Sequence, residues 1–233
     1  MFNEKVLAVL GQINGITDTA IIKYPTTVTY NEDQDVAVCF DVSKLDGDQF
    51  PEIPLFNNLS KFLNTIKLFK KPTFSFTDNQ VVISDGVSSA ELTLDNKALM
   101  ETYDKDDTQF KRSMEIPSVA EFDLSVNDIG SLKSACNVFK ELEHITITSK
   151  DGDVYISLDN TTKFNSKSSS YNIKKTAETS KEFSISLPVK KFVKLPPSDY
   201  VVRIKYNSAR DSYRVIFDCK TINLQVMMAI IAK

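Results

Sequence analysis

The sequence predicts an α+β protein of two tandem domains, each with two short helices packed against antiparallel sheets. Three observations lead to this prediction. Strictly alternating strands are joined by short turns, four amphipathic segments carry lysine on their polar faces, and the order of elements repeats in the second half. A chain of 233 residues, 42% of them hydrophobic, is long enough for two compact domains with cores of their own.

The predicted strands alternate between apolar and polar residues. Ile145 and Ile147 fall on one side of such a strand, and Thr146 and Thr148 fall on the other. The links at 77–79, 150–153 and 207–211 are short and polar, which favours meandering antiparallel sheets with one solvent-exposed face. The predicted strands are Ala20–Tyr24, Thr26–Tyr30, Val36–Val42, Thr73–Phe76, Val81–Ser84, Ser89–Leu94, Ala120–Leu124, Ile145–Ser149, Val154–Leu158, Ser169–Lys174, Phe183–Ser186, Val201–Tyr206, Arg214–Phe217 and Leu224–Ile230.

Four segments have the apolar spacing of one-sided helices. The second has Leu59, Phe62, Leu63 and Ile66 along one face and asparagine, threonine and lysine on the other. Ser125 is a predicted N-cap of the third, because Asp128 follows three residues later. The four predicted helices are Asn3–Ile13, Leu55–Lys71, Ile129–Leu142 and Pro188–Leu195.

The two halves share one order of elements, in which a helix, strands, a second helix and further strands follow each other. The second half also has a strand ahead of its first helix, Ala120–Leu124. The stretch between the halves has six acidic and four basic residues over 95–115 and no alternation. We therefore predict an N-terminal domain at 1–94, a connector at 95–117 and a C-terminal domain at 118–233, related by an old duplication.

Positive charge gathers on the predicted helices. Three stretches within the last three of them, 55–71, 129–140 and 187–195, hold nine lysines and no acidic residue, although the chain has a net charge of −3. On one helix such lysines are most simply a solvated face. Three helices that all omit acidic residues predict instead that the lysines share one polyanionic partner.

The residues needed for catalysis or metal binding are scarce. The chain has one histidine, His144, three widely spaced cysteines, and six glycines that form neither a GxGxxG motif nor a P-loop. The turns 46–48 and 151–153 lack the ligand series of a calcium loop. No apolar run reaches 18 residues. We expect no enzyme activity, cofactor, metal site or membrane partner.

The composition of the helix faces distinguishes between modes of nucleic-acid binding. Proteins that recognise a base sequence typically place arginine and asparagine on a helix that enters a groove. Proteins that bind single-stranded nucleic acid place aromatic residues among basic ones. The polar faces here hold lysine, asparagine, serine and threonine. These groups suit contacts to phosphates without reading bases, so sequence-independent binding of duplex DNA is expected.

With these features the chain resembles the DNA polymerase sliding clamps, namely PCNA and the clamps of T-even phages, and is most similar to the phage type. The resemblance spans nearly the whole chain through its pattern. The stretches that carry it are VLAVLGQIN, LFNNLSKFLNTIKLF, SVNDIGSLKSACNVFKELEHITITSKDGDVYISL, SISLPVKKFVKLPPSDYVVRIKY and NLQVMMAIIAK.

The resemblance implies a ring of three subunits whose helices line the hole around duplex DNA. The lysines expected to face the DNA are Lys5, Lys61, Lys67, Lys133, Lys140, Lys190, Lys191 and Lys194. Subunits of this family join head to tail through edge strands, here 88–94 and 168–175, with Ser89, Glu91, Thr93, Ser169, Tyr171 and Ile173 at the interface. The simpler interpretation is that each edge is short and polar enough to remain exposed.

The resemblance also implies partner proteins. These are a replicative DNA polymerase and an ATP-driven clamp loader, in the cytoplasm of an infected bacterial host. Partner peptides of clamps insert into an apolar pocket, for which Tyr30, Val36, Leu99, Met100 and Met228 are candidates by position, although such residues are more often core.

Two alternatives stay open. One is a monomeric processivity factor of the same fold, held to DNA by charge alone. The other is a phage structural β protein with incidental surface lysines.

Overall fold

The computed structural model describes residues 2–45 except 32 and 34, 53–55, 58–95 except 78, 110–159 and 171–231. The chain divides into two compact units, Met1–Lys111 and Arg112–Lys233, which we describe separately. Within each unit the described strands pair antiparallel, and helices accompany them, so the predicted α+β class is confirmed. No helix in the described part of the chain is long and apolar enough to cross a membrane.

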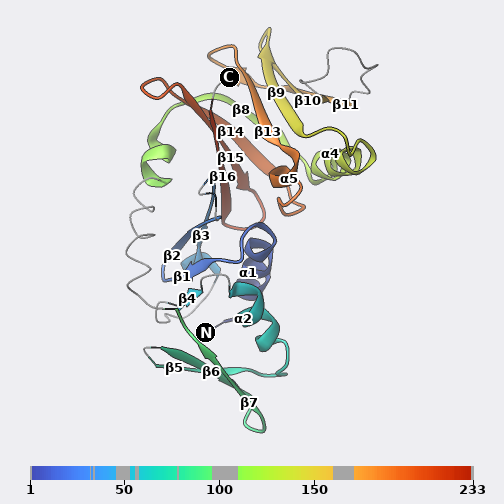
Figure 1. The fold of residues 1–233 in the computed structure, drawn as a ribbon. Helices are drawn as coiled ribbons and strands as arrows, with labels where there is room; N and C mark the ends of the chain where they lie inside the picture. Colours follow the sequence, from blue (N-terminus) through green and yellow to red (C-terminus); the bar gives the residue numbers. More distant parts are fainter. Residues whose placement is uncertain are drawn as a thin grey trace. The chain divides into compact units, whose positions relative to one another are not determined.

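The first unit begins with a helix and ends with a three-stranded meander (Figure 1). Strand β1 pairs with β4, β2 pairs with β3, and β5, β6 and β7 form the meander in that order. The elements are α1 (Glu4–Ile16), β1 (Ala20–Ile22), β2 (Thr26–Tyr30), β3 (Val36–Asp41), a 3₁₀ turn (Val42–Leu45), β4 (Ile53–Leu55), α2 (Leu59–Ile66), β5 (Thr73–Phe76), β6 (Gln80–Ser84) and β7 (Ser89–Thr93).

One face of α1 supplies much of the core of this unit. Val6, Leu10 and Ile13 are fully buried, and Phe40 and Phe62 reach the same degree of burial from β3 and α2. The spacing of the α1 residues is that of one helix face, which explains why a helix forms where the sequence predicts one. The side chain of Asn3 caps the helix by accepting a hydrogen bond from the Val6 amide at 2.9 Å.

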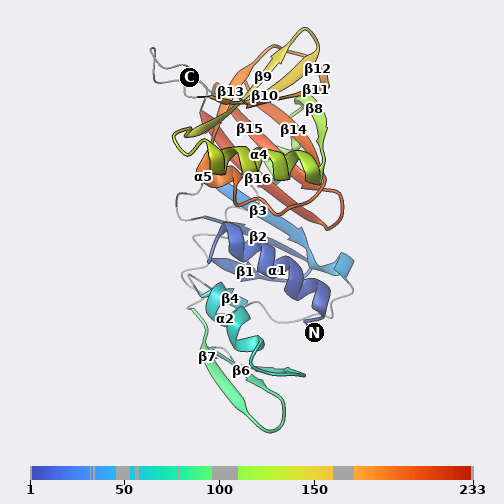
Figure 2. The ribbon, with the colours of Figure 1, turned by 90° about the vertical axis from the view of Figure 1, so that its right-hand side faces the viewer.

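The second unit has two sheets. One has the strand order β11-β10-β9-β13, and the other contains the run β12-β8-β14-β15-β16. Helix α4 crosses the strands of this unit on one side (Figure 2). The elements are β8 (Ser118–Leu124), α4 (Val126–Val138), β9 (His144–Lys150), β10 (Asp153–Asp159), β11 (Tyr171–Thr176), β12 (Glu178–Thr179), β13 (Ser184–Pro188), α5 (Val189–Phe192), β14 (Tyr200–Asn207), β15 (Ser212–Cys219) and β16 (Leu224–Ile231).

The pairing of the strands repeats between the units. In the first unit β1 pairs with β4, β2 with β3, and β5-β6-β7 form a meander. In the second unit the corresponding strands are β9 with β13, β10 with β11, and β14-β15-β16. These pairings recur around two helices in each unit, which supports the duplication that the order of elements predicts, although β9 also pairs with β10 in the second unit. Strands β8 and β12 have no counterpart among the described strands of the first unit.

The predicted cap of α4 is confirmed. Ser125 and Asp128 form a capping box in which each side chain accepts a hydrogen bond from the other's backbone amide, at 3.1 and 2.8 Å. Asp128 also binds the ammonium of Lys175 on β11 at 2.5 Å. Burial by itself would raise the pKa of Asp128, but the hydrogen bonds from Lys175 and Ser125 outweigh it and hold that pKa below its usual value of 3.8.

Some boundaries differ from the prediction. Leu55 is the last residue of β4 and pairs with Ala20, so α2 begins only at Leu59. The apolar spacing from Leu55 to Leu59 fits a helix, but pairing with β1 buries Leu55 instead and overrides this local preference. The short strand β12, which the sequence pattern does not predict, has only two residues.

The domain limits at 1–94, 95–117 and 118–233 stay a prediction. Residues 96–109 of the connector lie outside the described residues, and residues 110–115 are helical.

Lys205 is a buried lysine on β14, with 6% of its surface exposed. Its ammonium donates hydrogen bonds to the carbonyls of Met114 at 2.8 Å and Ile116 at 2.5 Å. These bonds hold the segment that leads into β8 against β14. Desolvation lowers the pKa of Lys205.

Replacing Asp128 with asparagine tests the ion pair and cap at the start of α4. We expect Asp128→Asn to lower the free energy of unfolding by about 1 kcal/mol near neutral pH, the usual cost of a weakened helix cap. The folded-state pKa of Asp128 is lowered, so its stabilising contribution is full above pH 3.8 and disappears as the pH falls through the folded-state value. Urea unfolding of both proteins at about pH 6 and about pH 2 measures this difference. Glu141→Gln, in the exposed turn after α4, is the control and should have little effect. An equal loss for Asp128→Asn at both pH values would contradict the assignment.

Candidate nucleic-acid interface

Helix α2 presents lysine to solvent because its opposite face is anchored in the core. Phe62 is fully buried, and its ring lies 5.7 Å from that of Phe2, which in turn lies 5.0 Å from Phe74 of β5. This contact turns Lys61 outward, and Lys67 is exposed in the turn after the helix. Lys70 and Lys71 lie beyond the helix end and are also exposed.

Polar contacts fix the start of α2 to the end of α1. The backbone amide of Ser60 donates to the Asp18 carboxylate at 2.6 Å, and the Leu59 amide donates to the Asp18 carbonyl at 3.0 Å. The Ser60 hydroxyl lies 2.8 Å from the side-chain oxygen of Asn14 on α1. The amides at a helix start need such partners, and these bonds fix where Lys61 lies.

Helix α5 has a similar arrangement in the second unit. Phe192 is 1% exposed and packs edge to face on Phe217 of β15 at a centroid distance of 6.1 Å. Lys190 and Lys194 are exposed, and Lys191 is partly exposed. The short helix is therefore held by one buried aromatic ring and offers a group of cationic side chains to solvent.

The longer helices α1 and α4 expose small, uncharged residues instead. The exposed positions of α1 include Gly11 and Gly15, and those of α4 include Gly130 and Ser131. Lys5 is exposed in the first turn of α1, next to Glu4, and Lys140 is exposed in the turn after α4. Most of the exposed charge of the helices thus lies on α2 and α5 and in the turns that follow them.

Lys133 differs from the other predicted DNA-facing residues. Its side chain is half-buried within the second unit, and its ammonium donates a hydrogen bond to the backbone carbonyl of Leu195. Desolvation lowers its pKa. The helical spacing of the sequence predicts an outward lysine here, but the structure directs the ammonium toward the segment after α5.

The two predicted interface strands lie at the edges of their sheets. Strand β7 ends the order β5-β6-β7, and β11 ends the order β11-β10-β9-β13. Ser89, Glu91 and Thr93 are exposed on β7. On β11, Tyr171 and Ile173 are partly exposed, and Ser169 lies outside the described residues.

The amides of β7 divide between its two sides. The Leu94 amide donates to the Asn79 carbonyl at 2.8 Å, and the Asp85 amide donates to the Ser88 carbonyl at 3.2 Å. Antiparallel alternation then directs the amides of Ala90 and Leu92 toward β6. The amides of the three exposed residues point to the open edge of the strand.

The structure describes three of the five residues of the predicted partner pocket. Tyr30, Val36 and Met228 are 6%, 3% and 2% exposed, which makes each a core residue of its own unit. Leu99 and Met100 lie outside the described residues. The pocket stays a prediction.

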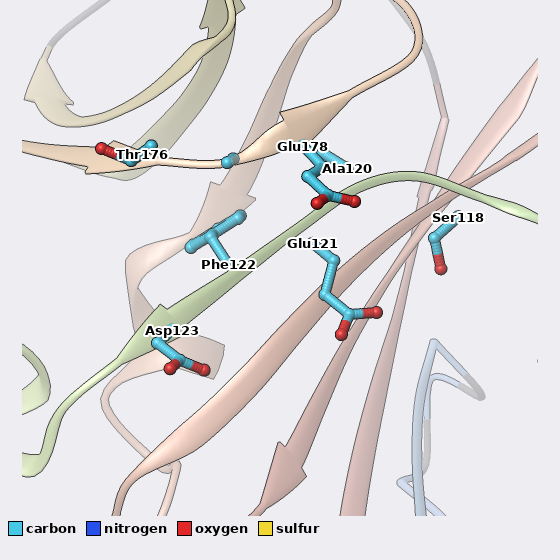
Figure 3. Close-up of a pocket in the computed structure, with 8 residues that line it drawn as sticks. Ser118, Ala120, Glu121, Phe122, Asp123, Thr176 and Glu178 are labelled. Atoms are coloured by element: carbon cyan, nitrogen blue, oxygen red, sulfur yellow. The ribbon is translucent and has the colours of Figure 1, made fainter.

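The sequence pattern does not predict a hollow of about 660 Å³ that lies beside β8 (Figure 3). It lies where the chain from β11 to β12 diverges from β8, and Glu121, Asp123 and Glu178 are among the residues that line it. Arg203 binds Glu121 at 3.0 Å and Asp218 at 2.6 Å, and Lys220 binds Asp123 at 2.8 Å. These acidic residues are largely paired with neighbouring cations, and their charge is opposite to that of α2 and α5. Among the described residues, no group of three or more histidine, cysteine, aspartate or glutamate side chains could hold a metal ion.

Comparisons with protein-family models and with curated protein sequences find no match. Solved structures do resemble this chain. The beta clamp of Helicobacter pylori in complex with 5-chloroisatin has a TM-score of 0.63 at 12% identity and covers 98% of this chain. This chain spans 64% of that one. A structure of the same clamp with a DNA ligase peptide gives a TM-score of 0.63 at 11% identity, covering 98% of this chain and 63% of that one.

PCNA-type proteins are matched over almost their full length. Proliferating Cellular Nuclear Antigen from Entamoeba histolytica has a TM-score of 0.61 at 14% identity, covering 97% of this chain and 94% of that one. The PCNA2–PCNA3 complex from Sulfolobus tokodaii gives 0.58 at 11% identity, with 97% and 95% covered. Sheets and helices arranged in this way over two units give the chain the fold of the DNA sliding clamps.

Proposed function

We propose that this protein is a sliding clamp that encircles duplex DNA without sequence preference and tethers a replicative DNA polymerase. The observation that carries the proposal is the group of exposed lysines on and just after α2 and α5, in an acidic chain with the clamp fold. Lysine contacts phosphates as a mobile point charge, which suits weak contacts that let a ring slide. The chain itself then needs no catalytic chemistry, because topology holds the DNA.

A ring requires subunits that join head to tail. Strands β7 and β11 support this, because each ends its sheet among the described strands, and the edge of a sheet is a template for pairing with another chain. One edge from each unit gives a heterologous contact, which closes into a ring when the rotation between subunits allows it. Three copies per ring follow from the likeness to two-domain clamps. A closed ring keeps the polymerase near its template, so that rebinding becomes intramolecular.

Partner proteins complete the proposal. The similar H. pylori clamp was solved with a DNA ligase peptide, which supports a peptide-binding role for this fold. By the same likeness, an ATP-driven loader opens the ring, and an infected bacterial host provides the cytoplasm in which a phage clamp works. A monomeric processivity factor would instead remain monomeric. A phage structural protein with incidental surface lysines would fail to bind DNA.

Charge reversal on the two short helices tests the DNA-binding face. We expect the double variant Lys61→Glu, Lys190→Glu to bind a duplex at least about tenfold more weakly. The slope of log K against log salt is negative, and it should become less steep by about 0.9 for each phosphate that the variant no longer neutralises. Fluorescence anisotropy with a labelled duplex at several salt concentrations measures both quantities. The matched control is Lys150→Glu, Arg210→Glu, which makes the same change of charge at two exposed residues away from the helices, one at the end of β9 and one in the turn after β14. An equal loss of affinity in the control would contradict the assignment of the face.

Removing one edge amide tests the assembly. Glu91→Pro deletes an amide that points to the open edge of β7, while the bonds between β6 and β7 remain. We expect a folded monomer at micromolar concentration where the wild-type protein forms the larger particle, as measured by light scattering. Glu91→Gln keeps the amide and should assemble like the wild type. Assembly of Glu91→Pro at wild-type strength would exclude β7 as the joining strand, and a monomeric wild type would exclude the ring itself.

A further inference from the structure

We infer that Lys133 is a positioning residue for the basic segment 189–195 and not a contact to DNA. The segment contains α5 and carries Lys190, Lys191 and Lys194. The inference rests on the proposed function for its DNA-binding part, and its structural part stands independently. It deepens that function by dividing the predicted lysines into two roles.

The sequence after α5 creates the need for a side-chain donor. Leu195 is followed by Pro196 and Pro197, and proline has no backbone N–H to offer the carbonyls at a helix end. Leu195 and Pro196 are buried, so water has little access to satisfy their carbonyls. Buried backbone carbonyls without a partner are rare, because leaving one unpaired is costly.

Two side chains supply the missing hydrogen bonds. The ammonium of Lys133 donates to the Leu195 carbonyl, and the hydroxyl of Tyr200 donates to the Pro196 carbonyl at 2.7 Å. The two donors come from α4 and β14, so they fix this turn from two elements. The backbone bond from the Leu195 amide to the Phe192 carbonyl, at 3.0 Å, then continues the constraint into α5.

The place of Lys133 in α4 also indicates an internal role. When the buried residues of α1 and α4 are aligned, Val6 matches Ile129 and Val9 matches Leu132. Lys133 then occupies the place of Leu10, which is fully buried in the first unit. The burial that lowers the pKa of Lys133 agrees with this position.

The first unit ties its two helices together with different groups. There the hydroxyl of Ser60 on α2 meets the side chain of Asn14 on α1 at 2.8 Å, and Asp18 binds the Ser60 amide. In the second unit the tie is made by Lys133 and the segment that follows α5. Both units thus secure their short basic helix to the longer first helix through a polar contact.

Measuring both amide exchange and DNA binding for Lys133→Met and Lys140→Met tests the inference. Methionine keeps an unbranched stem and removes the ammonium, and Lys140 is an exposed lysine just beyond the same helix. For Lys133→Met we expect amide hydrogen exchange at 193–195 to become at least about fivefold faster, because the segment loses a restraint. The salt slope of duplex binding should remain at the wild-type value. For Lys140→Met we expect unchanged exchange at 193–195. The slope of log K against log salt should become less steep by about 0.9 for each phosphate contact that is lost.

Two further variants separate positioning from general destabilisation. Lys133→Arg keeps a long side chain with donors and should restore slow exchange at 193–195 at least in part. Ile129→Val removes a buried methylene from the same helix and should lower the melting temperature without faster exchange at 193–195 than elsewhere in the unit. A less steep salt dependence of duplex binding for Lys133→Met, or unchanged exchange at 193–195, would overturn the inference. If the wild-type protein shows no salt-dependent DNA binding, the proposed function fails, and the exchange measurement still decides the role of Lys133.

Discussion

The placement of the exposed lysines depends on how two very short helices are held. Helix α2 has eight residues and α5 has four, and isolated helices shorter than about 12–15 residues are marginal in water. Neither helix can fix its own lysines in space. Burial of Phe62 and Phe192 provides the apolar anchor, and polar ties to the first helix of each unit provide the rest. In each unit the placement of the exposed lysines is therefore a property of the strands and of the longer helix that hold the short helix.

The repeated order of elements accounts for the related ways in which the two units hold their short helices. Each unit pairs the strand after its first helix with the strand before its second, as β1 with β4 and β9 with β13. That pairing determines where the second helix begins and keeps it beside the first. The start of each short helix shows the result, because the amides of Leu59 and Val189 both bond to carbonyls in the segment that follows the first helix, those of Asp18 and Glu143. The ladder is thus common to the two units, while the side chains that form the polar ties differ.

The sequence predicted the fold better than it predicted individual side chains. Strict alternation located β9 and the other long strands, since a period of two is typical of a strand with one buried face. It could not separate β4 from α2, because the apolar spacing around Leu55 fits both and only pairing with β1 decides. Helical spacing placed Lys133 outward, but the need of the Leu195 carbonyl for a donor comes from a segment about sixty residues away. Lys205 is buried for a similar reason, because carbonyls distant in the sequence surround its ammonium.

The arrangement of ion pairs sharpens the electrostatic argument. On the sheets of the second unit, Arg203, Lys220 and Lys174 bind carboxylates at 2.6–3.0 Å, so each cation is balanced locally. Among the described residues, no ion pair involves Lys61 or Lys190. A balanced pair has a weak field beyond its own contact, whereas an unbalanced lysine acts over roughly the Debye length of 8 Å at physiological salt. Under the proposed function, the phosphate backbone meets the field of unpaired helix lysines such as Lys61 and Lys190. For the proposed clamp, a chain of net charge −3 then attracts DNA through the lysines of its short helices, while four cations on and beside the sheets of the second unit are neutralised by their own carboxylate partners.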